Sequence, residues 1–286
     1  MNVTIRRGTP QDSIALGVIC YEAFKAIADE HRFAPDFLDA VTAAGFLGSM
    51  IEHPGFFDLV AEVDGRVVGS NFLDERNTIS GVGPITVDHH SQNTGIGRAL
   101  MDAAMRRSTD RRFAGIRLVQ AGYHRRSLAL YIKLGFEIRE TLLCLQGPAV
   151  RIAVPGCMVR PAVDADLTAC NELCVGVHGF ARAGELADAL SQSSARVVER
   201  AGRVTGYATT IAFFGHAVGE TNDDLRALIG AADAYPGPGF LVPAANGDLL
   251  RWCLGHGLRI TQPMTLMSMG QYQQPAGAAW MPSVVY

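Results

Sequence analysis

The feature that most constrains the fold of this chain is an internal repeat. Three short blocks occur twice in the same order; the first copies lie at residues 5–12, 63–69 and 118–136, and the second at residues 159–166, 200–206 and 241–258. In the middle block, Asp64-Gly65 or Ala201-Gly202 stands between two β-type stretches, which is typical of a β-hairpin. The repeat indicates that both halves of the chain have the same succession of strands and helices.

That succession predicts two domains of mixed α/β type. Each half reads as a strand, a helical region, hairpin strands, a long strand, and then helix, strand, helix and strand. This order favours a mostly antiparallel sheet flanked by helices. The length of 286 residues suits two domains of similar size. Residues 148–156, with two prolines and a glycine, are the predicted linker between a domain at 1–147 and a domain at 157–286.

The composition favours a folded protein and excludes several partners. Apolar residues make up 48% of the chain and charged residues 19%, which suits a buried core rather than disorder. A net charge of −3 offers no basic surface to a nucleic acid. No run approaches the roughly 20 apolar residues that cross a bilayer, and the N-terminal residues lack the apolar stretch of a signal peptide. We therefore expect a cytoplasmic protein that binds neither nucleic acid nor membrane.

The cysteines raise the question of a metal site. Six are present, without the paired spacing of a zinc ribbon. Cys170, Cys174 and His178 recur every four residues and would share one face of a helix. Such a face either offers three metal ligands or is half-buried, and no fourth ligand is evident nearby. The cysteines are predicted to be free thiols packed as small apolar side chains, and no metal is expected.

Residues 82–107 contain the clearest candidate for a ligand site. Ile85, Thr86 and Val87 form a β-branched run that predicts a strand, and residues 99–105 are rich in helix formers. The loop between them consists of Gln92, Asn93, Thr94, Gly95, Ile96, Gly97 and Arg98. A strand, a glycine-containing loop and a helix N-terminus form an anion site, because free backbone N–H groups and the helix dipole point at the ligand. The glycines would let the backbone approach a pyrophosphate closely.

Two motifs in this half resemble those of the GCN5-related N-acetyltransferase (GNAT) family. Gln92-x-x-Gly95-x-Gly97-Arg98-Ala99-Leu100 resembles motif A, and Ser127 to Phe136, with its Leu-Tyr-x-Lys-x-Gly-Phe core, resembles motif B. A Rossmann or Walker site would need a third glycine or a Gly-Lys-Ser/Thr ending, and both are missing. The resemblance covers the motifs closely, the rest of residues 1–147 loosely, and the second half only as a faded copy.

The resemblance implies that the first half binds acetyl-CoA as an acetyl donor. The backbone of Ile85 to Val87 would pair with the pantetheine arm, the loop from Gln92 to Arg98 would hold the pyrophosphate, and Ser127 would add a cofactor contact. An amine would attack the thioester directly, and Tyr131, with an unperturbed pKa of about 10, would protonate the departing thiolate. Taken by itself, Tyr131 is equally well explained as a core aromatic residue.

His124 stands where motif B often has an asparagine. One interpretation is a hydrogen bond to the pantetheine, and the other is a catalytic role in accepting the proton of the substrate amine. The general base is likewise open, with candidates beside the long strand, on the first helix and near the hairpin: Asp88, His89, His90, Glu22, Asp74 and Glu75. A water relay is a further alternative.

The second half lacks both parts of this site. In place of the glycine loop it has Glu220 to Leu225, with three carboxylates that would repel a pyrophosphate. Arg251 stands in the position of Tyr131. The acids either form a pocket for a cationic amine or cap a helix. We therefore expect a degenerate GNAT-like domain that has lost CoA binding and shapes the acceptor site or a dimer interface.

These features predict an acetyl-CoA-dependent N-acetyltransferase that acts on a primary amine of a small molecule or peptide. The rival prediction is a non-catalytic acyl-CoA sensor or scaffold, which would bind CoA without turnover. The aromatic tail, residues 271–286, is expected to pack on the body or on the partner chain of a homodimer. The carboxylate of Tyr286 is a further candidate base.

Overall fold

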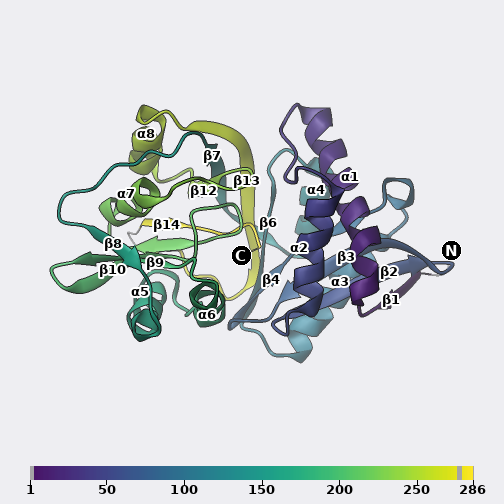
Figure 1. Ribbon diagram of the computed structural model, residues 1–286. Helices are drawn as coiled ribbons and strands as arrows, with labels where there is room; N and C mark the ends of the chain where they lie inside the picture. Colours follow the sequence, from purple (N-terminus) through teal and green to yellow (C-terminus); the bar gives the residue numbers. More distant parts are fainter. Residues whose placement is uncertain (1–2, 276–278, 286) are drawn as a thin grey trace.

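The computed structural model describes residues 3–275 and 279–285 (Figure 1). The elements of the first half are β1 (Val3–Arg6), α1 (Ser13–His31), α2 (Ala40–Glu52), β2 (Phe56–Val63), β3 (Arg66–Asp74), β4 (Ile79–Val82), β5 (Thr86–Val87), α3 (Ile96–Asp110), β6 (Gly115–Ala121), α4 (Arg125–Lys133) and β7 (Glu137–Gln146). Those of the second half are β8 (Met158–Pro161), α5 (Leu167–His178), α6 (Ala183–Ser191), β9 (Arg196–Arg200), β10 (Arg203–Ala208), β11 (Ala217–Gly219), α7 (Asn222–Ala231), β12 (Phe240–Pro243), α8 (Gly247–Gly255), β13 (Arg259–Gly270) and β14 (Ala279–Met281).

The two halves repeat one order of elements. From β1 to β7 and from β8 to β13 the chain runs through a strand, two helices, a set of antiparallel strands, and then helix, strand, helix and strand. The repeat extends to side chains that start the first helix of each half. Arg6 of β1 holds Asp12 at 2.7 Å, and Arg160 of β8 holds Asp166 at 2.7 Å. The predicted mixed α/β fold is confirmed.

The halves exchange a strand in their sheets. We expected one sheet for each half, whereas the described residues form a nine-stranded sheet from both halves, in the order β1-β2-β3-β4-β6-β13-β7-β12 with β5 paired to β3. β13 lies antiparallel between β6 and β7, so that Met267 pairs with Leu118 on one side and Ile138 on the other. β7 in turn lies between β13 and β12 (Figure 1). The predicted linker at 148–156 connects β7 of this nine-stranded sheet to β8 of the second sheet, but the nine-stranded sheet contains strands from both sides of it.

Burial on both faces explains why β13 is stable in this position. Met264 and Leu266 pack into the core of the second half, whereas Met267 packs with Leu118 and Tyr131 in the core of the first. Full burial of a side chain of this size contributes about 1.5–3 kcal/mol. Withdrawal of β13 would therefore expose two cores at once, which ties the stability of one half to the other.

The second sheet incorporates the C-terminal tail. Within the described residues it has five strands in the order β14-β11-β10-β9-β8. β14 pairs antiparallel with β11, so that Trp280 lies opposite Val218, and Trp280 is only 6% exposed. The tail therefore packs on the body of its own chain. Tyr286, the terminal candidate base, lies outside the described residues.

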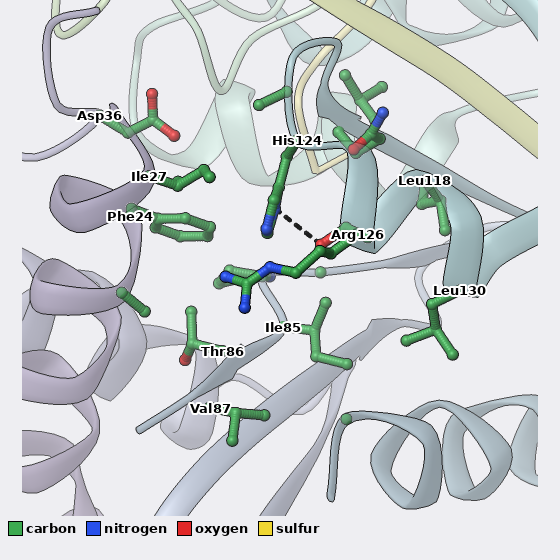
Figure 2. Close-up of a pocket in the computed structure, with 18 of the residues that line it drawn as sticks. Phe24, Ile27, Asp36, Ile85, Thr86, Val87, Leu118, His124, Arg126 and Leu130 are labelled. Carbon is green, nitrogen blue, oxygen red and sulfur yellow. Dashed lines mark hydrogen bonds between the residues drawn. The ribbon is translucent and has the colours of Figure 1, made fainter. Parts of the chain in front are cut away.

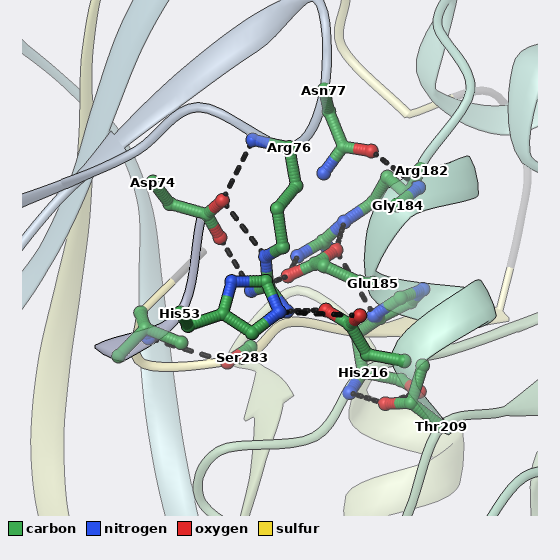
Figure 3. A network of polar contacts seen from close by, with 12 residues as sticks. His53, Asp74, Arg76, Asn77, Arg182, Gly184, Glu185, Thr209, His216 and Ser283 are labelled. Carbon is green, nitrogen blue, oxygen red and sulfur yellow. Dashed lines mark hydrogen bonds and ion pairs between the residues drawn. The ribbon is translucent and has the colours of Figure 1, made fainter. Parts of the chain in front are cut away.

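A buried network of charges also joins the halves (Figure 3). Arg76, which follows β3, bonds to Asp74 at 2.9 Å and to Asp188 of α6 at 2.8 Å, and lies 3.6 Å from Glu185. Glu185 also accepts a hydrogen bond from Arg182 at 2.8 Å. Burial alone would raise the pKa of Glu185, but the arginine charges outweigh burial and lower it. A buried carboxylate is stable only with such partners, so α6 is fixed against the first half.

The described residues contain no helix long and apolar enough to cross a membrane. They also contain no group of three or more His, Cys, Asp and Glu side chains that could hold a metal ion. Cys170, Cys174 and His178 share one face of α5 and are each at most 2% exposed. His178 makes an edge contact with Trp280 at 5.4 Å. This face is therefore part of the core of the second half, and all six cysteines are free thiols.

Candidate functional site

A pocket of about 490 Å³ lies where α1, β5, β6 and α4 of the first half converge (Figure 2). The sequence-predicted residues that line it are Ile85, Thr86, Val87, Gln92, Asn93, Gly95, Gly97, Arg98, His124, Ser127 and Tyr131. Thr94 and Ile96 are not among the lining residues. The Thr94 hydroxyl donates to the carbonyl of Ser91 at 2.6 Å, and Ile96 is 1% exposed in the core beneath α3.

The loop into α3 presents an uncapped helix N-terminus to this pocket. Gly95 precedes the first helical residue with φ of 92°, in the left-handed region that glycine adopts without strain, and no side chain caps the helix. The first N–H groups of a helix have no partner within the helix. Those of α3 are therefore left for a ligand, and the helix dipole adds positive potential there.

Two neighbouring features favour an anion at this end of the pocket. A Cβ on Gly97 would make only ordinary van der Waals contacts, at 3.8 Å to Val87 and 4.0 Å to Leu130, so no side chain crowds the first turn of α3. Arg126 reaches the loop from α4 and donates to Gln92 at 3.1 Å, while Gln92 donates to the carbonyl of Val87 at 3.2 Å. Arg98 adds a second guanidinium, which is more than half exposed.

The strand beside the loop has one free edge. Thr86 and Val87 of β5 pair with Ser70 and Gly69 of β3, and the described residues place no strand on their other side. The predicted strand over 85–87 is shorter than expected, because Ile85 follows Gly83-Pro84, which separates β4 from β5. Proline has no N–H to donate to a ladder. Backbone groups of β5 can therefore pair with an extended ligand in the pocket.

α4 aligns three polar side chains on one face. His124 precedes the helix, and its Nδ1 lies 2.8 Å from the Ser127 hydroxyl. Tyr131, one turn after Ser127, is 5% exposed and lies in edge contact with Phe136 at 6.2 Å. Burial raises the pKa of Tyr131 to about 12, against a smaller opposing effect of a hydrogen bond with Ser127. Tyr131 is thus a protonated phenol at neutral pH.

Burial raises the pKa of Tyr131 but lowers the pKa of His124. Burial is the main cause that lowers the pKa of His124 to about 4, and the nearby charge of Arg126 lowers it further. The imidazole is therefore neutral at pH 7. A group with this pKa is a weak base, so the geometry favours hydrogen bonding over proton abstraction as the role of His124.

Most of the candidate bases have other partners. Asp88 accepts from Arg66 at 2.8 Å and caps the turn at His90. Asp74 is bound to Arg76, and Glu75 is bound to Arg107 at 2.7 Å. Glu22 and His90 are exposed and do not line the pocket, whereas His89 is exposed and lines it. The structure thus leaves His89 as the only one of these six that borders the pocket.

Several lining residues had no signal in the sequence. Asp36, in the segment between α1 and α2, is a carboxylate that accepts from Gln262 of β13 at 3.1 Å. Phe213 and Phe214 also come from the second half, as do Val284 and Val285 of the tail. The second half therefore reaches the pocket by three segments, which are β13, the loop between β10 and β11, and the tail.

The counterpart of the loop in the second half is closed by its own side chains. α7 begins with a capping box in which Thr221 N–H donates to Asp224 at 2.9 Å, and Asp224 is fully buried. Asp223 pairs with Arg226 at 2.8 Å, and Glu220 is bound to Arg203. Of the two alternatives for these acids, helix capping is the one the structure shows for Asp224.

The counterpart of the free strand edge is closed as well. β5 and β11 occupy matching positions, since β5 pairs with β3 at Gly69 and β11 pairs with β10 at Gly206, the same glycine of the repeated hairpin block. The free side of β5 borders the pocket, whereas that side of β11 is hydrogen-bonded to β14, which in turn contacts β12. The tail therefore fills the groove of the second half.

Residues 55–138 match the family model of the acetyltransferase (GNAT) domain. This segment contains both motifs and most of the residues that line the pocket, so the first half of the chain is similar to a GNAT acetyltransferase domain. No curated protein shows a significant match to the sequence.

Solved structures resemble the chain over nearly its whole length. A protein from Pyrococcus horikoshii that has been assigned as an acetyltransferase covers 94% of this chain and 89% of its own, with a TM-score of 0.72 and 17% identity. A GCN5-related N-acetyltransferase from Sphaerobacter thermophilus covers 95% of this chain and 96% of its own, with a TM-score of 0.62 and 13% identity. At these identities the likeness establishes the fold, and it extends over both halves.

Proposed function

We propose that the protein is an acetyl-CoA-dependent N-acetyltransferase with one cofactor site per chain. The observation that carries this proposal is the pairing of an uncapped helix N-terminus with a free strand edge in one pocket, at α3 and β5. The first suits a pyrophosphate and the second suits the amides of a pantetheine arm. The GNAT domain match over the same segment supports the assignment.

In this proposal the acetyl group lies between α4 and the aromatic end of the pocket. The amine nitrogen forms a bond to the thioester carbon, the C–S bond breaks, and Tyr131 donates its proton to the leaving thiolate. The raised pKa of Tyr131 keeps that proton in place until the thiolate forms. The second half contributes Phe213, Phe214 and the tail to the acceptor end, which is how it shapes the acceptor site.

The alternative function is a sensor that binds acyl-CoA without turnover. Such a protein needs no space beyond the thioester. The pocket continues past Tyr131 to Phe46 and Phe214, so there is room for an acceptor, and we favour the enzyme.

The proposal is tested by calorimetric titration of the full chain with acetyl-CoA, followed by assay of CoA release with primary amines. We expect one site per chain and thiol release that depends on the amine. Two sites per chain would contradict the closed groove of the second half. Binding without turnover across an amine panel would favour the sensor, and absence of binding would refute both functions.

A further inference from the structure

The end of the pocket away from the phosphate loop is aromatic. Phe46 of α2 lies 4.4 Å from Phe214 and 5.8 Å from Phe37, measured between ring centroids. Phe24 of α1 lies 6.4 Å from Phe37. Val285 of the tail borders the same space. Such a lining suits a ligand with an aromatic or branched apolar body.

Two carboxylates, Asp36 and Glu30, line the pocket, and Asp36 is the one that the second half holds through Gln262. Figure 2 shows Asp36 on the α1 side of the pocket with Phe24 and Ile27, and His124 and Arg126 on the other side. Among the described residues, no arginine, lysine or histidine forms an ion pair with Asp36. Its partner is the neutral amide of Gln262, which in turn accepts from the Tyr123 hydroxyl at 3.1 Å. A carboxylate in such a place lacks a cation, and an ammonium would supply one.

Arg126 and Glu30 also line the pocket, but three titratable groups that interact electrostatically with Asp36 are neutral at pH 7. They are Cys20 of α1, Cys144 of β7 and Tyr123 before α4, and burial raises the pKa of each of them. Burial also raises the pKa of Asp36, against the smaller opposing effect of the hydrogen bond from Gln262. A carboxylate with a raised pKa is a better proton acceptor than an exposed one.

Asp36 lacks a cation, and a second polar group in the pocket lacks any hydrogen-bond partner. Gln120 of β6 is 7% exposed, lines the pocket, and has no hydrogen-bond partner at either atom of its amide. Leaving a buried polar group unpaired costs free energy, because the group loses its hydrogen bonds to water and gains none in exchange. A ligand with a polar group would recover part of this free energy, so the pocket is built for an occupant.

We propose that Asp36 binds the ammonium group of the acceptor and takes its proton, and that the acceptor is a primary amine on an aromatic or branched apolar body. This inference rests on the proposed function. One proton passes from the ammonium nitrogen to a carboxylate oxygen of Asp36, and the freed lone pair forms the C–N bond as the C–S bond breaks. The nitrogen then loses its second proton, which replaces the proton that Tyr131 gives to the departing thiolate. The proton on Asp36 leaves to solvent after the product departs.

Gln262 acts in this scheme as a positioning residue. It belongs to the exchanged strand β13, is 3% exposed, and holds Asp36 through its amide nitrogen. The catalytic carboxylate is thus supplied by the first half and oriented by the second.

The test compares acetylation of 2-phenylethylamine with that of spermidine, which carries amines on a flexible chain without a ring. We expect the wild-type kcat/KM to be higher for 2-phenylethylamine. Asp36→Asn should lower kcat/KM for 2-phenylethylamine by about 10²–10⁴-fold, the range for loss of a general base. Calorimetric affinity for acetyl-CoA should stay within about twofold, because Asp36 is not part of the loop or of the strand proposed to hold the cofactor. Glu22→Gln is the matched control, since it removes an exposed carboxylate of α1 that does not line the pocket.

Gln262→Leu provides the readout that a purely structural role would not change. Loss of its hydrogen bond removes an effect that lowers the pKa of Asp36, so the acidic limb of kcat/KM should move to higher pH. An unshifted limb would refute the positioning role.

Full activity of Asp36→Asn, a preference for spermidine, or a loss caused instead by Glu30→Gln at the same pocket would overturn the inference. Acetyl-CoA binding would still stand in those cases. Absence of acetyl-CoA binding by the wild-type chain would refute the proposed function itself.

Discussion

The two halves have the same order of elements, but the backbone groups at the start of the third helix and along the neighbouring strand edge are unpaired in one half and paired in the other. In the first half the N-terminus of α3 is uncapped and one edge of β5 borders a pocket. In the second half Asp224 caps α7, and β14 is hydrogen-bonded to β11. One groove is left open for a ligand, and the other is filled by the chain itself.

The difference shows that a repeated fold does not carry a repeated site. A buried backbone N–H or C=O needs a partner, and that partner is either a ligand or the protein. Asp224 and residues 279–281 provide the same types of contact that an anion and an extended ligand would make. A second half without a cofactor site, as we propose, is therefore compatible with a stable fold.

The largest expected effect is a loss of CoA affinity in the open groove of the first half. Gly97→Asp places a carboxylate at the first turn of α3, where its Cβ has space, so the fold should be retained. Two like charges about 4 Å apart repel by about 4 kcal/mol at an effective dielectric constant of about 20, a factor of about 1,000 in affinity. Calorimetric titration with CoA should show this loss.

The matched control is in the second half. Counted from the first helical residue, Asp223 of α7 corresponds to Gly97 of α3. Asp223→Asn should neither weaken CoA binding nor create a second site, because Asp224 still caps the helix. Retained CoA affinity in Gly97→Asp would remove the first turn of α3 from the site.

The next effect concerns the filled groove. Trp280→Ala removes most of a buried side chain from β14 and should lower the free energy of unfolding by about 3–5 kcal/mol, as for other large-to-small core changes. Denaturant unfolding measures this change. The stoichiometry of CoA should stay at one per chain. A stability equal to that of the wild type would show that β14 is not an integral part of the second half.

A smaller effect is expected at the reacting end of the open groove. Tyr131→Phe keeps the ring contact with Phe136 but removes the phenolic proton, so turnover should fall by about 100-fold while acetyl-CoA affinity changes little. With its pKa raised to about 12, Tyr131 stays protonated through the neutral range, and any loss of activity below about pH 10 must have another origin. Stopped-flow or steady-state assays would separate the two parameters, and unchanged turnover would exclude Tyr131 from the reaction.

The smallest effect should come from His124. Because its pKa is lowered to about 4, His124 does not change charge between about pH 6 and 9. His124→Gln, which keeps a hydrogen-bonding side chain near Ser127, should reduce kcat by less than about tenfold and leave the shape of the pH profile unchanged. Disappearance of an ionisation near neutral pH would identify His124 as the base.

The repeat and the phosphate loop were predictable because both depend on local sequence. Hairpin glycines, the loop at 92–98 and the helix end at Gly135 require particular backbone conformations, and Gly135 indeed has φ of 97°. The order of elements in both halves follows from the same kind of signal.

The remainder depends on contacts between residues far apart in the chain. Nothing in residues 259–270 distinguishes a strand that pairs with its own half from one that enters the other half, since both positions bury the same apolar side chains. For this reason the pattern of residues 259–270 did not predict that Gln262 would contact Asp36. Asp36 was missed because a single aspartate between two helices is also typical of an ordinary loop.

The strand exchange has a consequence for biosynthesis. As the ribosome synthesises the first half, β6 and β7 have no strand between them until residues 259–270 are made. The edges of the nascent sheet stay unpaired during that interval and are open to association with other chains. A fragment of residues 1–147 would keep this defect permanently, although it contains most of the pocket. The smallest unit that can fold around the pocket is therefore nearly the whole polypeptide.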